Sequence, residues 1–284
     1  MPELPEVTTT VKQLKSAIVG TQIIDIWSSY KSPHYKGKKN IKDPKYFSFF
    51  KKETLGKKIT NVRRVGKNVL IDLNDKQTIL VHMKMTGHFL IGSYIKKDKH
   101  IRMIFKLKGK EFGEKKVLAF SDLRKFAKIT LDTEDLNKLG PDPLSKEFTV
   151  MVLKEKILKK PKGRIKNVLM DQTLISGIGN IYSDEALWLT GIHPETKPRE
   201  ITEKQIEGLY RNIQKVLKKG IDLGGDSTSD YRRLDGTAGE FQLRHQVYGR
   251  KGEKCMKEGC TGTITREMVG GRSAHFCDVH QKRK

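Results

Sequence analysis

The sequence predicts a multidomain α+β fold, in which an N-terminal helix and a β-rich domain precede a helical domain and a small C-terminal hairpin. Three observations lead to this prediction. Short segments rich in branched residues fill most of the region from residue 21 to residue 131, the periodicity becomes helical from about residue 147, and all three cysteines follow residue 250. A chain of 284 residues is long enough for two domains and an extra module.

The first predicted element is a helix from Pro5 to Gly20. Proline suits the first helical position, and glycine suits the position where a helix ends. Four apolar residues fall on one helical face: Val7, Val11, Leu14 and Ile18. Glu6 lies in the first turn, where the helix dipole favours an acid, so Pro2 and Glu3 stand just outside a helix N-terminus.

Strand-like segments follow this helix, and polar turns separate them. Together they predict an all-β sandwich or barrel, with strands within residues 21–27, 61–73, 77–85, 88–94, 101–107, 116–123 and 125–131. Residues 30–58 interrupt the series with many lysines and six tyrosines and phenylalanines. We expect a basic, partly ordered insertion there, whose aromatic side chains form a local packing cluster rather than platforms for base stacking.

The two prolines of "LGPDPL", residues 139–144, predict a domain boundary, and four helical segments follow it. They lie within residues 148–160, 163–171, 180–191 and 202–220. The glycine-rich stretch 224–241 is too long for an ordinary connection and predicts a functional loop.

A second glycine-rich turn joins two of these helical segments. Gly177 and Gly179 lead into Asn180, which is placed to cap the next helix. Backbone N–H groups at such a helix start can bind an anion. Basic residues flank the turn and favour a clamp on a DNA backbone, namely Lys159, Lys160, Lys162, Arg164 and Lys166. The alternative is a tight helical turn with a solvated basic face.

The chain carries 57 lysines and arginines against 33 acids, a formal charge of +24. A polyanion partner explains this excess, because neutralising phosphates releases counterions; a lysine-biased proteome is the other explanation. No apolar run approaches the ~18 residues of a membrane span, and the N-terminus lacks the features of a signal peptide. We therefore expect a soluble intracellular protein.

The C-terminal segment predicts a metal site. Cys255 and Cys260 are separated by four residues, and sixteen more lead to Cys277, with His280 three positions further. Two close pairs around a hairpin-length linker are typical of structural zinc. The linker alternates and turns at Gly270-Gly271, as in a β-hairpin. We expect one structural Zn²⁺ with His280 as the fourth ligand, and His275 is the competing candidate.

Several motifs along the chain resemble those of a known family. The motifs "PELPEV", the "GK" of "RRVGKNVLIDL", "HMKMTG", "SDLRKF", "LMDQTLISGIGNIY" and the zinc hairpin occur in the order found in formamidopyrimidine-DNA glycosylases, a family that includes the endonuclease VIII-like enzymes. The resemblance covers essentially the whole chain. It implies a catalytic β-sandwich over residues 1–138, a helix–two-turn–helix DNA-binding domain over 147–223, a lesion-capping loop over 224–243 and a zinc finger over 244–284.

The resemblance implies a bifunctional DNA glycosylase and AP lyase of base excision repair, and the chemistry of the N-terminus agrees. Once Met1 is removed, the secondary amine of Pro2 can attack C1′ of a damaged nucleotide and expel the base, and the resulting iminium is an electron sink. Glu3 can protonate the sugar ring oxygen or shuttle protons. Glu6, one helical turn further, can orient the amine.

Other site residues follow from the resemblance alone. Lys67 is the acid in β-elimination and contacts phosphate, and Arg272 grips phosphates and supports δ-elimination. An apolar wedge, an aromatic wedge and an arginine fill the hole left by the flipped base: Met85, Phe126 and Arg124. The DNA backbone is contacted by His82, His100, Lys162 and Asn180. Without the resemblance, Met85 and Phe126 could be ordinary core residues.

Three departures from the family pattern bear on these roles. The first cysteine pair has four intervening residues where bacterial members usually have two, and His280 replaces a fourth cysteine. Both make the ligand set less certain than the zinc itself. Near residue 98 the chain has "DKH" where the family often has "HDH", which makes Asp98 a poor backbone contact and leaves His100 as the candidate.

The motif "PELPE" and the long loop favour the branch that removes oxidised purines, namely 8-oxoguanine and formamidopyrimidines. The alternatives are an endonuclease VIII-like enzyme for oxidised pyrimidines and a non-catalytic DNA-binding zinc protein. We expect the partner to be damaged double-stranded DNA, with no membrane association and a monomeric chain. We expect the cytoplasm, at the nucleoid, in a prokaryote, and the nucleus in a eukaryote.

Overall fold

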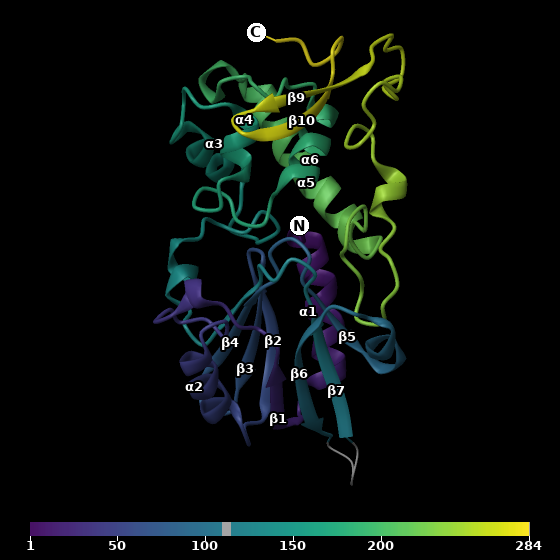
Figure 1. The fold of residues 1–284 in the computed structure, drawn as a ribbon. Coiled ribbons are helices and arrows are strands. Elements are labelled where there is room, and N and C mark those ends of the chain that lie inside the picture. The colour runs from purple at the N-terminus through teal and green to yellow at the C-terminus, as the bar shows by residue number, and fades with distance from the viewer. Residues whose placement is uncertain (110–114, 284) are drawn as a thin grey trace. The chain divides into compact units, whose positions relative to one another are not determined.

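The computed structural model describes residues 1–109 and 115–283 and divides into two compact units (Figure 1). The first unit comprises Met1–Asn137 and Leu223–Glu240, and the second comprises Lys138–Asp222 and Phe241–Lys284. The chain therefore leaves the first unit near the predicted boundary and returns to it for one segment, which we call the return segment, Leu223–Glu240. Among the described residues, no helix is both long and apolar enough to span a membrane.

The first unit contains two antiparallel four-stranded sheets, which confirms the predicted β-sandwich (Figure 1). One sheet has the order β1-β6-β7-β5, with bounds Gln22–Ser28, Ile101–Lys108, Lys115–Ser121 and His88–Ile91. The other has the order β2-β3-β4-β8, with bounds Ile59–Val65, Asn68–Leu73, Thr78–His82 and Lys128–Thr130. Both sheets contribute buried side chains to one core, including Val69, Val81, Phe89, Met103 and Phe120.

Helix α1, Leu4–Ile18, contacts strands β2 and β3 of this unit (Figure 1). It begins one residue before the predicted start, with Glu3 as its N-cap, and the chain turns away at Gly20 with φ +86°. Three of the four residues of its predicted apolar face are buried and Val11 is partly buried against the core. The burial explains the helix, because isolated helices of this length are marginal in water.

The insertion of residues 30–58 contains helices, which the sequence did not predict. A 3₁₀ turn, Pro33–Tyr35, precedes α2, Pro44–Thr54. Asp43 caps α2 by accepting a hydrogen bond from Lys45 N, and Pro44 occupies the first position. Phe50 is fully buried in the core, which supports the expected packing role of the aromatic residues. Lysines around this apolar face hid its helical spacing in the sequence.

Two strand predictions also changed in detail. Residues 61–73 form two strands, β2 and β3, because the chain reverses at Gly66 and Lys67. Residues 88–94 begin as β5 but continue as a 3₁₀ helix, Gly92–Lys97.

The second unit is helical and ends in a hairpin, as predicted. Its helices are α3, Val150–Leu158, α4, Ile165–Met170, α5, Asn180–Thr190, and α6, Glu203–Asp222, with 3₁₀ turns at Pro198–Glu200 and Phe241–Arg244. Strands β9, Ile264–Val269, and β10, Arg272–Cys277, pair in antiparallel register. Gly270 and Gly271 both have positive φ, the conformation that a two-residue hairpin turn of this kind requires. Strand β10 packs against α5.

Candidate functional site

The N-terminal tip is held by the first turn of α1. Pro2 is buried, and Glu3, also buried, has the extended conformation of an N-cap. Glu6 Oε2 accepts a hydrogen bond from Glu3 N at 2.7 Å, and Glu6 Oε1 accepts one from Asp226 N at 2.8 Å. The carboxylate of Glu6 thus joins the residue after Pro2 to the return segment.

The return segment is anchored on the first unit at several points. Tyr231 is buried and donates a hydrogen bond to the Glu6 carbonyl at 3.2 Å, and Leu234 belongs to the core. Gly225 has φ +91°, and a Cβ there would lie about 3 Å from both Tyr231 and Glu6. Residues 228–230 are exposed. The predicted functional loop therefore has a base that is held by buried contacts and a tip, residues 228–230, that is exposed.

Lys67 and His82 lie on the same sheet of the first unit, Lys67 in a turn and His82 at the end of β4. Lys67 occupies the β2–β3 turn and is almost fully buried, and Asn68 pairs with His82 across β3 and β4. His82 Nδ1 accepts a hydrogen bond from Lys84 N at 3.0 Å, so the proton of the neutral ring sits on Nε2. Burial, with the nearby lysines Lys84 and Lys67, lowers the pKa of His82 to about 3. His82 can therefore meet a phosphate as a neutral donor.

Met85, Arg124 and Phe126 form a cluster on the surface of the first unit, which we call the wedge cluster. The Arg124 guanidinium lies 4.5 Å from the centre of the Phe126 ring and 3.0 Å from Met85 Sδ. Met85 is 41% exposed and Phe126 48% exposed. The interpretation of these two residues as core residues is therefore wrong.

Asp98 and His100 lie close together, and the polar contacts of Asp98 within the protein are well defined. Asp98 accepts a hydrogen bond from His100 N at 2.6 Å and lies 3.6 Å from His88 Nε2. The contact with His88 holds the pKa of Asp98 at about 2. Asp98 is thus hydrogen bonded within the protein, and both Asp98 and His100 line a pocket of about 350 Å³ together with Arg232 of the return segment.

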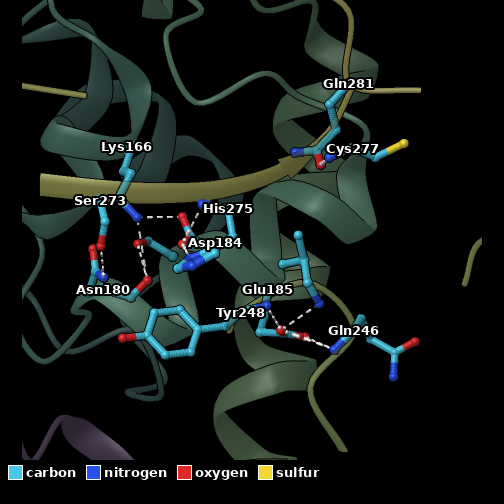
Figure 2. Close-up of polar contacts among 12 residues, drawn as sticks. Lys166, Asn180, Asp184, Glu185, Gln246, Tyr248, Ser273, His275, Cys277 and Gln281 are labelled. Carbon is cyan, nitrogen blue, oxygen red and sulfur yellow. Dashed lines mark hydrogen bonds and ion pairs between the residues drawn. The ribbon is translucent and has the colours of Figure 1, made fainter. Parts of the chain in front are cut away.

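In the second unit, Asn180 is not the helix cap that the sequence suggested. Gly179 is the N-cap of α5, and Asn180 is the first helical residue. Its Nδ2 atom lies 3.4 Å from Ser273 Oγ on β10, next to the exposed Arg272 (Figure 2). Because glycine fits the extended cap conformation without side-chain help, the Asn180 side chain is available to link the turn to the hairpin.

The prediction that Lys166 belongs to a basic clamp was wrong. Lys166 is fully buried on α4 and forms an ion pair with Asp184 of α5 (Figure 2). Asp184 Oδ2 also accepts from His275 N at 2.9 Å and lies 3.2 Å from His275 Nδ1. A charge pattern in a sequence cannot show burial, whereas Lys162 does remain exposed, as the clamp requires.

The sequence interpretation missed Asp184 and Glu185, which are both buried. Glu185 accepts hydrogen bonds from the backbone N–H groups of Gln246, Val247 and Tyr248 at 3.0 Å (Figure 2). Burial nevertheless raises the pKa of Glu185 above its usual range. Two acids inside an otherwise apolar helical segment, "SDEALW", were the available signal. Asp184 links α5 to strand β10 of the hairpin, and Glu185 links α5 to residues 246–248, which precede the hairpin.

The structure brings Cys255, Cys260, Cys277 and His280 together, with their ligand atoms all within 4.8 Å of one another. The Sγ atoms of Cys260 and Cys277 are 3.6 Å apart, and His280 Nδ1 lies 3.5 Å from Cys255 Sγ. Neighbouring sulfurs of a tetrahedral zinc site with bonds of about 2.3 Å stand about 3.8 Å apart, so the spacing fits a metal ion.

The orientation of His280 also favours a metal at this cluster. His280 Nε2 donates to the Trp188 carbonyl at 3.1 Å, which leaves Nδ1 deprotonated and facing the cysteines. Burial raises the pKa of the Cys277 thiol to about 11, and a bound metal ion would favour its thiolate form. His275, the competing ligand, is directed to Asp184 instead.

The chain is similar to one family of proteins over most of its length. The model of the formamidopyrimidine-DNA glycosylase N-terminal domain matches residues 1–129, and that of the H2TH domain matches residues 139–232. A formamidopyrimidine-DNA glycosylase of Lactococcus lactis is 36% identical, with full coverage of both chains. One of Carboxydothermus hydrogenoformans is 39% identical over 99% of this chain and 100% of its own.

A solved structure extends this similarity to the fold. It is the crystal structure of a complex between a Lactococcus lactis FPG mutant and a DNA that contains Fapy-dG. The two chains are 35% identical, with a TM-score of 0.85 over 99% of this chain and 100% of the other.

Proposed function

The chain belongs to the formamidopyrimidine-DNA glycosylase family, and we infer its function from this premise. It is a DNA glycosylase of base excision repair with AP lyase activity. We propose that it removes 8-oxoguanine and formamidopyrimidines from double-stranded DNA as a monomer. The relative crystallised on Fapy-dG DNA supports this choice of lesion.

The observation that carries the mechanism is the position of Pro2 and Glu3 at the start of α1. Once Met1 is removed, the Pro2 nitrogen attacks C1′ of the damaged nucleotide. The new N–C1′ bond forms as the glycosidic bond breaks, and the base leaves with the bonding electrons and a proton. The positive end of the helix disfavours protonation of the amine and so leaves more nucleophile at neutral pH.

Glu3 then protonates the sugar ring oxygen, and the open sugar carries an iminium on Pro2. Glu6 contributes by holding the backbone of Glu3 through the 2.7 Å hydrogen bond, which fixes the amine next to it. The iminium acidifies the C2′ protons, and loss of one of them expels the 3′ phosphate. We assign Lys67 to the protons of this β-elimination and Arg272 to the phosphate of the following δ-elimination.

The wedge cluster of Met85, Arg124 and Phe126 fills the hole that the everted nucleotide leaves. Exposed apolar side chains suit unstacked bases, and the Arg124 guanidinium can donate to the orphaned partner base. His82, His100, Lys162 and Asn180 bind the DNA backbone in this proposal. Their chemistry supports it, since His82 is a neutral donor and Lys162 an exposed cation.

We propose one structural zinc ion, held by Cys255, Cys260, Cys277 and His280. Four protein ligands close the coordination sphere, so the ion stabilises the hairpin and takes no part in the reaction. In the described residues the hairpin core is small, which makes a metal an effective stabiliser. The fixed hairpin then presents Arg272 at its turn.

A panel of duplexes tests the substrate class. Duplexes of the same length and surrounding sequence, each with 8-oxoguanine, a formamidopyrimidine or thymine glycol, are compared by kcat/KM. We expect the two purine lesions to be preferred. A preference for thymine glycol by about tenfold, or ~1.4 kcal/mol of transition-state stabilisation, would assign the enzyme to oxidised pyrimidines.

A further inference from the structure

We propose that Thr86 and the buried carboxylate of Asp122 are positioning residues that hold the wedge cluster in its inserting conformation. The inference rests on the function proposed for Met85, Arg124 and Phe126. It assigns to two other residues the task of setting where those side chains stand before DNA binds.

Asp122 lies at the centre of a hydrogen-bond network beneath the wedge cluster. It is fully buried, and its Oδ2 accepts from Tyr30 Oη at 2.7 Å and from Ala127 N at 2.9 Å. Its Oδ1 accepts from Thr86 Oγ1 at 2.5 Å. Burial beside Asp122 raises the pKa of Tyr30, so the phenol remains a donor. The carboxylate thus joins three segments: the chain just after β1, through Tyr30, the turn that carries Met85, through Thr86, and the loop of Arg124 and Phe126, through Ala127.

Thr86 connects the two loops that carry the wedge cluster. Its hydroxyl donates to Asp122 and accepts a hydrogen bond from Arg124 N at 3.1 Å. Thr86 also directly follows Met85, and its carbonyl accepts from His88 Nδ1 at 3.2 Å. One buried hydroxyl therefore relates the backbone of Met85 to the backbone of Arg124.

The backbone around the wedge cluster is strained in a way that such a network explains. Three non-glycine residues of the described chain have positive φ, and two of them, Lys84 and Lys125, flank the wedge cluster with φ of 56° each. Residues other than glycine rarely adopt a positive φ, and they keep it where contacts with the surrounding structure hold the backbone in place. Lys125 N is hydrogen bonded to the Asp122 carbonyl at 3.3 Å. At Lys125 the turn brings Arg124 over the ring of Phe126.

The Met85 turn is also fixed from the other side. Gly87 N donates to the Met83 carbonyl at 3.1 Å, and a Cβ at Gly87 would lie 2.5 Å from that oxygen. The turn is therefore tight, and two described contacts tie it to Arg124: the Thr86 hydroxyl holds the Arg124 backbone, and Met85 Sδ contacts the Arg124 guanidinium. Loss of this hydroxyl would remove the contact that holds the Arg124 backbone to this turn and leave only the exposed contact between the side chains of Arg124 and Met85, while the sandwich core stays intact.

The test compares Thr86→Val, which removes only the hydroxyl, with Thr86→Ser, which keeps it. Thr54→Val is the matched control, because Thr54 is equally buried but bonds within α2, to Phe50 O. We expect Thr86→Val to lower kcat/KM for 8-oxoguanine in duplex by about tenfold or more, since small misplacements of positioned groups have effects of this size. Cleavage of a preformed abasic site should change much less, and Thr86→Ser should restore excision.

A second readout follows the wedge cluster directly. A duplex with a tetrahydrofuran abasic analogue opposite 2-aminopurine reports by fluorescence when side chains enter beside the orphaned base. We expect a slower insertion phase in Thr86→Val than in wild type, Thr86→Ser or Thr54→Val. Equal kinetics in Thr86→Val and wild type, or equal losses on both cleavage substrates, would overturn the inference.

The triple variant Met85→Ala/Arg124→Ala/Phe126→Ala separates this inference from the function on which it rests. If the triple variant lowers duplex excision selectively and Thr86→Val does not, only the positioning role fails. If the triple variant loses both substrates equally, the proposed role of the wedge cluster fails as well.

Discussion

Lysines in this chain have one of two roles, and burial decides between them. Lys166 is fully buried and paired with Asp184, whereas Lys162, four residues earlier, is exposed. Burying a charge costs several kcal/mol of hydration free energy, which a close partner of opposite charge must offset. Lys166 therefore has a structural role in the ion pair with Asp184. The sequence shows two basic residues four positions apart, and it could not assign them different roles before their burial was known.

Histidines show the same dependence on contacts. The spacing from Cys277 favoured His280 over His275 as the fourth metal ligand, and the structure places His280 Nδ1 in the cysteine cluster. His275 instead binds Asp184. Short-range spacing was therefore enough to select the candidate, because His280 follows Cys277, the last residue of β10, by only three positions.

The zinc proposal predicts a distinct result for each of these residues. By elemental analysis, wild type and His280→Cys should hold about one zinc per chain, and Cys277→Ser should lose it. His275→Ala should keep the metal, because that ring faces Asp184. Loss of zinc in His275→Ala together with retention in His280→Ala would contradict the ligand set.

At the scale of elements, the periodic segments were predicted and the contact-dependent ones were not. Helix α1 and the β9–β10 hairpin carry their own signals, a proline start and a glycine pair. Helix α2 was missed, although Asp43 and Pro44 are suitable residues for a helix start, because its apolar face is short and surrounded by lysines. The burial of Phe50 against the sandwich shows which face packs. Tertiary packing, absent from local sequence, supplies most of the stability of such a helix.

The exposed tip of the return segment should affect lesion choice without affecting the fold. Replacing residues 228–230 by glycines keeps the buried anchors Tyr231 and Leu234, which a deletion of residues 227–236 would remove. We expect 8-oxoguanine removal to fall more than removal of formamidopyrimidines. A loop that closes over an everted base loses conformational entropy but gains hydrogen bonds to the base, and this gain matters most for a lesion that stacks well in the duplex.

Cleavage assays on both duplexes, with thermal unfolding as the stability control, check this expectation. Tyr231→Phe is the comparison variant at the buried anchor, since it removes the hydroxyl that donates to the Glu6 carbonyl and keeps the ring and the tip. Equal losses on the two lesions in the glycine variant would show that the tip has no part in lesion choice.

At the scale of the whole molecule, the order of domains followed from the sequence but one connection did not. The β-rich part, the helical part and the hairpin appear in the predicted order. The return segment follows α6 in the chain yet packs on the first unit, through Glu6 and Leu234. Contacts across more than 200 residues, such as Asp226 N to Glu6, leave no local pattern in a sequence.

The charge of +24 predicts that DNA binding depends strongly on salt. With Lys67, Lys162 and Arg272 on phosphates, the logarithm of the binding constant should fall against the logarithm of salt concentration with a slope of about −3 or steeper. Lys162→Ala should reduce that slope by about 1. Lys12→Ala, an exposed lysine on α1, is the control, and an equal change there would argue for a diffuse charge effect.

The central claim is that Pro2 is the covalent nucleophile. The most direct measurement is borohydride trapping on an 8-oxoguanine duplex, followed by mass spectrometry of the digested adduct. The account predicts a sugar remnant on the nitrogen of Pro2, with Met1 absent, and no trapping in Pro2→Gly or in a chain that retains Met1. A remnant on a lysine such as Lys67, or wild-type trapping in a chain that retains Met1, would contradict it.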